Sequence, residues 1–279
     1  MTSLTALCPR GASIPCAASI LRAALFLSVA PALAQSPSAP IPTAVPARPT
    51  VTNPAHIPTP GYLQFEQGFQ QANNSPDFSS QLSLLQATKI AFNHRLMVLI
   101  QTQPIAHSTV NSRPTNDTGD LDAGIQYLVF DGNENGDKRP TIALEYLDRA
   151  RAGTAPSIDI GSYNKSALLL ASGDIPHLHY DTNFIVNEQN TGTTRRAQLG
   201  QTLLLTHNFT PRFALAAEIW HFTQPLSHGN AIGNLWTIGY TPRPNIVFDA
   251  GFNRGLTTTS TQWETFAGIT YVLPHRFWK

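Results

Sequence analysis

Among the residues whose types and spacing could do chemistry are His177, His179 and Asp181, which stand at alternate positions of one stretch. Alternate side chains of a β-strand point to the same face, so two imidazoles and a carboxylate would project together. Such a set could hold a metal ion, or it could line a polar barrel interior opposite Leu178 and Tyr180. Because two-residue spacing alone does not specify a metal site, we predict no metal and no cofactor.

The acidic run Asp131–Asp137 resembles the start of a calcium-binding loop, with oxygen ligands at alternate positions and glycine at the sixth. A complete loop ends on a bidentate glutamate at its twelfth position, and Ile142 stands at that position here. We therefore interpret this run as a polar turn.

Nucleophilic catalysis has little support in the sequence. A hydrolase needs a serine, a histidine base and an orienting group, but the sequence has no Gly-x-Ser-x-Gly elbow and no glycine-rich phosphate loop. The two cysteines, Cys8 and Cys16, both precede the apolar core of an expected signal peptide, so the mature chain would have no thiol chemistry. We expect a protein that is not an enzyme, with an envelope barrel enzyme such as a lipid hydrolase as the alternative.

The elements that would position these residues are strands with two different faces. Leu121, Ile125 and Val129 alternate with Asp122 and Gln126, so one face is apolar and the other is polar. Similar segments recur along the chain and predict twelve strands. Their expected ranges are 61–72, 79–92, 95–103, 119–130, 141–148, 163–171, 176–188, 196–207, 213–222, 230–240, 245–254 and 262–273.

The connections between these strands differ in length on the two sides. If both termini lie on one side, the turns on that side are short except for 131–140, whereas the loops on the other side include the long segments 104–118 and 149–162. Outer-membrane barrels have short periplasmic turns and long external loops, and closure satisfies every backbone group in the bilayer. We therefore predict an all-β, antiparallel up-and-down transmembrane β-barrel of about twelve strands.

The N-terminal region predicts export. Residues 1–34 have the apolar run and the Ala32-Leu33-Ala34 cleavage site of a secretory signal peptide. Residues 35–60 hold eight prolines and predict a disordered linker, and the barrel domain is expected to cover 61–279. With 18 Lys and Arg against 17 Asp and Glu and no basic cluster, the chain has no electrostatic footprint for nucleic acid.

Alternation also predicts which side chains face the lumen and which face lipid. The expected lipid-facing residues are Leu121, Ile125, Phe184, Phe248 and Ile269. The expected lumen-lining residues are Glu66, Asp120, Asp122, Gln126, Glu145, His177, His179, Asp181, Glu218, Asp249, Glu264, Lys89, Arg95 and Arg196. Because acidic residues dominate the lumen set, we predict a mild preference for cations.

Three stretches carry a resemblance to a known family. Gly119–Tyr127, Ile246–Leu256 and Phe266–Tyr271 are similar to the Gly-Asp-rich, Asp-Ala-Gly and closing strands of the outer-membrane barrels described as transporters of the meta-pathway of phenol degradation. The sequence departs from that pattern at Gln126, where a lysine is frequent, and at Lys279, where such barrels end on an aromatic residue. The resemblance implies transport of small molecules, aromatic or hydrophobic compounds included.

These observations together predict a porin-like protein of the bacterial outer membrane that lets small molecules pass by passive diffusion. Its expected partners are an unidentified small-molecule solute, outer-membrane lipids and the barrel assembly machinery, with no nucleic acid. A lumen of fixed polar groups would replace part of a solute's hydration. The alternatives are the envelope enzyme, a plugged structural or interaction barrel that transports nothing, and a soluble periplasmic sandwich.

Overall fold

The computed structural model describes residues 41–132, 139–158, 163–190, 193–226 and 229–278. These residues belong to one compact unit, Pro40–Lys279. The expected signal peptide, residues 35–40 of the expected linker, and residues 133–138 of the acidic run fall outside the described residues.

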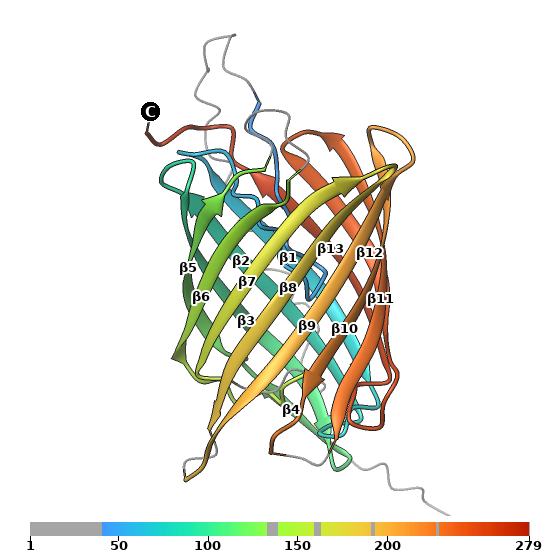
Figure 1. Ribbon diagram of the computed structural model, residues 1–279. Helices are drawn as coiled ribbons and strands as arrows, with labels where there is room; N and C mark the ends of the chain where they lie inside the picture. Colours follow the sequence, from blue (N-terminus) through green and yellow to red (C-terminus); the bar gives the residue numbers. More distant parts are fainter. Residues whose placement is uncertain (1–40, 133–138, 159–162, 191–192, 227–228, 279) are drawn as a thin grey trace, which may run out of the picture. The chain divides into compact units, whose positions relative to one another are not determined.

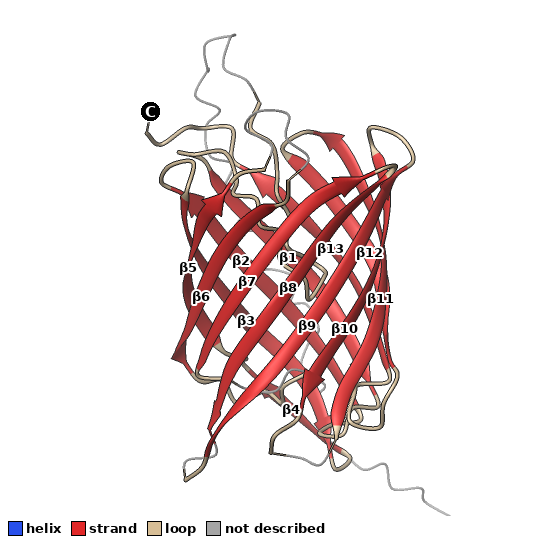
Figure 2. Ribbon diagram, viewed as in Figure 1, coloured by secondary structure: helices blue, strands red, loops and turns tan. Residues whose placement is uncertain are grey.

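The described residues form antiparallel strands joined by loops and turns (Figure 2). No helix in this part of the chain is long and apolar enough to cross a membrane. In chain order the strands are β1 (Leu63–Asn73), β2 (Ser80–Ala91), β3 (Leu96–Val110), β4 (Arg113–Asp117), β5 (Leu121–Phe130), β6 (Thr141–Arg151), β7 (Lys165–Ile175), β8 (Leu178–Asn190), β9 (Arg195–Asn208), β10 (Phe213–Thr223), β11 (Asn230–Arg243), β12 (Ile246–Gly255) and β13 (Trp263–Val272).

Apart from β4, which pairs with β3 alone, each strand pairs with the next strand along the chain, and the first strand also pairs with the last. β1 lies between β2 and β13, while β2 also pairs with β3, so the sheet closes into a barrel with tilted strands (Figure 1). The expected up-and-down barrel is therefore confirmed. Twelve strands form the wall, because β4 pairs only with the outer part of β3.

The expected loop 104–118 is the part of the strand prediction that is wrong. β3 continues to Val110, turns through Asn111 and Ser112 with φ values of 49° and 61°, and returns as β4. Beyond the bilayer no lipid face has to be apolar, so this hairpin lacks the alternation that revealed the other strands.

The outer surface of the wall is apolar, as the alternation predicts. Ile125, Phe184 and Phe248 are 48%, 44% and 45% exposed, values typical of side chains that face the bilayer rather than a core. Leu121 and Ile269 have the same outward parity and are half-buried. The predicted lipid face is therefore consistent with the strand register.

The inner surface has an apolar zone beside a polar one. Met97, Leu99, Trp220 and Phe222 are buried in one cluster inside the barrel. The Trp220 indole N–H donates to Oδ1 of Asn253 at 3.0 Å, which satisfies its one polar group. The interior of the barrel therefore combines a packed core with hydrogen-bonding groups.

The proline-rich segment does not behave as the expected free linker. Residues 41–60, which we call the plug, have no helix or strand, yet Thr52 and Ala55 are completely buried. Plug residues bond to β1, β6, β7, β8 and β10 of the wall, so the plug crosses the lumen (Figure 1, blue). Proline prevents ladder pairing, but the remaining backbone N–H and C=O groups still need partners, and the polar wall supplies them.

Candidate functional site

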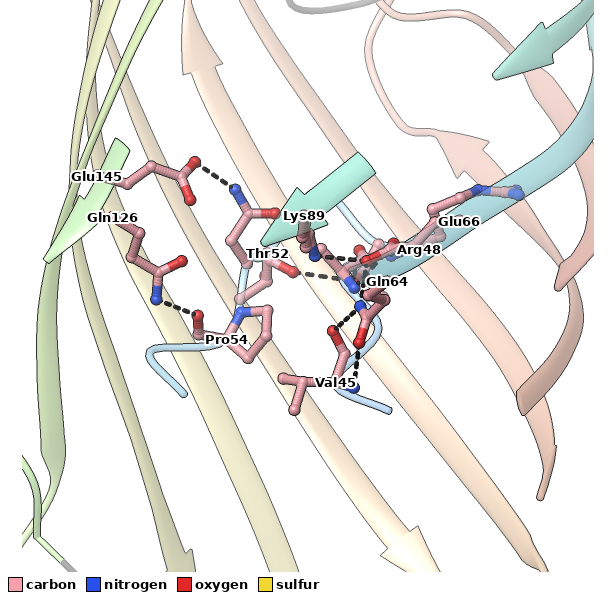
Figure 3. A network of polar contacts seen from close by, with 12 residues as sticks. Val45, Arg48, Thr52, Pro54, Gln64, Glu66, Lys89, Gln126 and Glu145 are labelled. Carbon is pink, nitrogen blue, oxygen red and sulfur yellow. Dashed lines mark hydrogen bonds and ion pairs between the residues drawn. The ribbon is translucent and has the colours of Figure 1, made fainter. Parts of the chain in front are cut away.

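The first limb of the plug lies along β1. The backbone N–H of Val45 donates to Oε1 of Gln64 at 2.9 Å, and Nε2 of Gln64 donates back to the Val45 carbonyl at 2.7 Å (Figure 3). The amides of Ala47 and Arg48 both donate to Oε2 of Glu66, at 3.1 and 3.0 Å. Side-chain oxygens of Gln64 and Glu66 thus accept the backbone N–H groups of this limb, as the carbonyls of a neighbouring strand would.

The middle of the plug is anchored on β10 by Glu218. This carboxylate accepts the N–H of Val51 at 3.1 Å and the N–H of Thr52 at 2.7 Å. Oγ1 of Thr52 lies 2.6 Å from Glu218 Oε1 and 2.7 Å from Oγ1 of Thr202 on β9. Glu218 and Thr202 are both buried, so this contact lies in the interior of the barrel.

The return limb bonds to β5, β6, β7 and β8. Asn53 donates its N–H to Asn183 Oδ1 at 2.7 Å and its Nδ2 to Glu145 Oε1 at 2.9 Å. Nε2 of Gln126 donates to the carbonyls of Pro54 and Ala55 at 3.2 and 3.0 Å (Figure 3). Each of these four strands therefore contributes a polar side chain that bonds to the plug.

Arg48 is seated in a notch that two glycines make. Gly68 of β1 and Gly268 of β13 are direct partners in the sheet. A Cβ added at either would lie 1.6 or 2.2 Å from Nη1 of Arg48, so no other residue leaves room for the guanidinium. Nη2 of Arg48 lies 3.9 Å from Oδ1 of Asp249, which neighbours Gly268 on β12.

Most of the predicted lumen residues lie where parity places them. Eight of them are buried on the inner face: Glu66, Lys89, Gln126, Glu145, Asp181, Glu218, Asp249 and Glu264. Asp120, Asp122 and His179 are half-buried. Lys89 lies 2.5 Å from Glu66, so the charge of this lysine is paired.

Three predicted lumen positions need correction. Arg95 and His177 are exposed in turns, because β3 and β8 begin one residue after each of them, and His177 has a φ of 69°. Arg196 has inward parity but is exposed at the start of β9. Since His177 is outside the lumen, the predicted face of His177, His179 and Asp181 does not form, and no group suited to a metal ion occurs in the described residues.

Sequence reasoning missed the plug, and its partners Gln64, Thr202 and Asn183 were not among the predicted lumen-lining residues. One signal for them exists in the sequence. These inward positions carry amides and hydroxyls that a small interior would leave unpaired, and buried polar groups need partners. The glycines at Gly68 and Gly268 are a second signal, because they remove side chains from facing positions of the wall.

A cavity of about 360 Å³ remains in the lumen between the plug and residues 155–158 of a long loop. Its lining includes Arg48 of the plug, Asp122 of β5, Gln101 and Gln103. The loop folds back against the wall, since Nε2 of Gln81 donates to the Pro156 carbonyl at 3.0 Å. The lumen is thus partly filled and partly open to a small molecule.

No protein-family model matches the sequence, and no curated protein matches it. Among solved structures, the NanC porin aligns with a TM-score of 0.52 and 11% identity over 76% of this chain and all of the porin. The KdgM porin, solved with disordered oligogalacturonate, aligns with a TM-score of 0.49 and 12% identity over 75% of this chain and 98% of that one. The resemblance to the phenol-pathway family is not confirmed. The chain has the fold of a bacterial outer-membrane porin barrel, and residues 41–60 of the chain occupy part of its lumen.

Proposed function

We propose that this protein is an outer-membrane channel for passive passage of small molecules, and that the plug determines whether the lumen is open. The observation that carries this proposal is how the plug is attached. Side-chain hydrogen bonds hold it to the wall with no strand ladder, as at Glu66 and Glu218. Such contacts break one at a time, and water or a solute can replace them.

The size of the barrel supports the same proposal. Eight-stranded barrels are just filled by their own side chains, whereas barrels of sixteen strands leave an aqueous channel. Twelve strands lie between these limits, and here the plug and a cavity of about 360 Å³ take up the remaining space. Withdrawal of the plug would leave a path lined by polar groups that replace part of a solute's hydration.

The charges on the wall favour cations. Among the described residues six carboxylates and one lysine are buried, and Glu218 loses its plug partners when the plug leaves. Withdrawal also removes Arg48 from the lumen. Carboxylate-lined pores favour cations, so the open channel should select cations more strongly than the plugged one.

A narrower version of the proposal is passage of aromatic or hydrophobic compounds. It is supported by the family resemblance and by the inward-facing Trp220 and Phe222. A reduction of single-channel current by added phenol would favour this version, and an unchanged current would remove it.

A reversible lock tests the channel proposal. Residues 41–279 contain no cysteine, and the hydroxyls of Thr52 and Thr202 touch, so the double variant Thr52→Cys, Thr202→Cys should form a disulfide that fixes the plug. We expect little current through the oxidised protein in a planar bilayer and larger, cation-selective current after reduction. The two single variants serve as controls. Equal currents before and after reduction would contradict the proposal.

We propose no catalytic role for the barrel. Labelling of the purified, folded protein by a serine-directed probe would favour the envelope hydrolase instead. Outer-membrane lipids and the barrel assembly machinery remain proposed partners, and loss of folded protein on depletion of that machinery would support the second.

A further inference from the structure

We propose that the cavity beside the plug is a binding site for an elongated zwitterion, with an ammonium and a carboxylate separated by several atoms, as in an ω-amino acid or a short peptide. This inference rests on the proposed channel function, because it names the class of solute that the lumen would admit. It is carried by charged groups of opposite sign that line one cavity and have buried atoms without a hydrogen-bond partner.

The positive group is Arg48. Its side chain is 10% exposed, it lines the cavity, and its Nε and Nη1 atoms are buried with no hydrogen-bond partner. Asp249 does not supply these hydrogen bonds, because its Oδ1 atom lies 3.9 Å from Nη2 of Arg48, which is beyond hydrogen-bonding distance. A guanidinium forms bidentate bonds to carboxylates, so a carboxylate is the ligand group that best satisfies Arg48.

The negative group is Asp122 on β5. Its side chain also lines the cavity, and its Oδ1 atom is buried with no hydrogen-bond partner. The adjacent Asp120 is already engaged, because it accepts from Gly153 at 2.7 Å and lies 3.4 Å from Arg149. Asp122 therefore offers a carboxylate that a ligand ammonium would neutralise.

The two charges come from different parts of the wall, which sets the shape of the ligand. Arg48 rests against Gly68 on β1, while Asp122 belongs to β5, and β2 and β3 lie between these strands. Neighbouring strands are about 4.8 Å apart, so the charges are too far apart for the adjacent ammonium and carboxylate of an α-amino acid. The amide of Gln101 lines the space between and suits a peptide group.

Four ligands of matched size test this site: 6-aminohexanoate, its α-amino isomer norleucine, hexylamine and hexanoate. Isothermal titration of the purified full-length protein in an uncharged detergent should show the tightest binding for 6-aminohexanoate. We expect each of the other three to bind at least about tenfold more weakly, because each loses one charge-assisted contact. Equal binding of all four, or binding of none, would overturn the proposal.

Substitutions locate the site. Asp122→Asn should remove the preference for 6-aminohexanoate over hexanoate, and Arg48→Gln should remove the preference over hexylamine, whereas Asp77→Asn in the exposed loop between β1 and β2 should change neither. An unchanged preference in folded Asp122→Asn would overturn the inference. If a variant does not fold, the ligand series on the native protein still decides. If the reduced Thr52→Cys, Thr202→Cys variant carries current but the protein binds no zwitterion, the channel proposal stands and this inference falls. If the protein binds the zwitterion but carries no current, the binding site stands and the channel proposal falls.

Discussion

Replacing Gly68 with alanine tests the Arg48 notch without altering the plug. A Cβ at Gly68 would lie 1.6 Å from Nη1 and 2.1 Å from Cζ of Arg48, and its nearest neighbours all belong to that side chain. Alanine is otherwise acceptable inside β1, where glycine is destabilising by roughly 0.5–1 kcal/mol relative to alanine. The substitution should therefore expel the guanidinium and leave the wall intact.

The expected magnitude follows from the ion pair that is lost. The Arg48 and Asp249 side chains are 10% and 5% exposed and 3.9 Å apart. Breaking a buried pair costs about 3–5 kcal/mol. Here the pair is loose, and water can reach Asp249 once the plug moves, so we expect a smaller loss of about 2 kcal/mol. That loss would change the equilibrium constant between the docked and undocked plug by about 30-fold in favour of the undocked state.

Hydrogen exchange measures this equilibrium at the amides of Val51 and Thr52, which donate to Glu218. In Gly68→Ala these two amides should exchange about 30-fold faster, while strand amides keep their protection. In an Arg48→Ala background the same substitution should add nothing, because no guanidinium is left to displace. Unchanged exchange in Gly68→Ala, or an equal effect with and without Arg48, would refute the reasoning.

Other substitutions test the remaining parts of the structure. Glu218→Ala removes the acceptor of two plug amides, so proteolysis within the plug should become at least about tenfold faster. Ile125→Arg should cost about 2–4 kcal/mol on the lipid face and lower the folded yield, whereas Ile125→Leu should not. Burial, followed by the nearby His179, holds the pKa of His56 below its ordinary value of 6.5. The undocked plug therefore binds more protons than the docked one near that pH, so docking should be strongest above about pH 6.5 and weaken on acidification. The readout is the protection factor at Thr52, because the intrinsic rate of amide exchange itself depends on pH. A protection factor that is independent of pH in the native protein, or that keeps its pH dependence in His56→Gln, would contradict this.

The wall of the barrel could be predicted because the bilayer imposes a rule on every strand that crosses it. Lipid requires an apolar side chain at each outward position, and this alternation is visible in β5, where Ile125 is exposed and Gln126 is buried. Where the rule stops, prediction failed. β4 pairs with β3 alone and is not part of the twelve-strand wall, and Arg95 and His177 lie just outside their strands.

The plug was missed for a different reason. Its prolines rule out ladder pairing, which is usually a sign of disorder, but hydrogen bonds to side chains far along the chain can also fix an irregular segment. Thr52 bonds to Glu218 across 166 positions, and no local pattern marks such a contact. The predicted lumen set contained Glu66, Gln126, Glu145 and Glu218 without indicating that plug backbone would occupy them.

The conductance of a protein that lacks residues 41–58 tests the central claim most directly. The purified deletion variant should remain a heat-modifiable, folded barrel and should carry a steady, cation-selective current in a planar bilayer, well above that of the complete protein. A folded deletion variant that passes no more current than the complete protein would contradict the account.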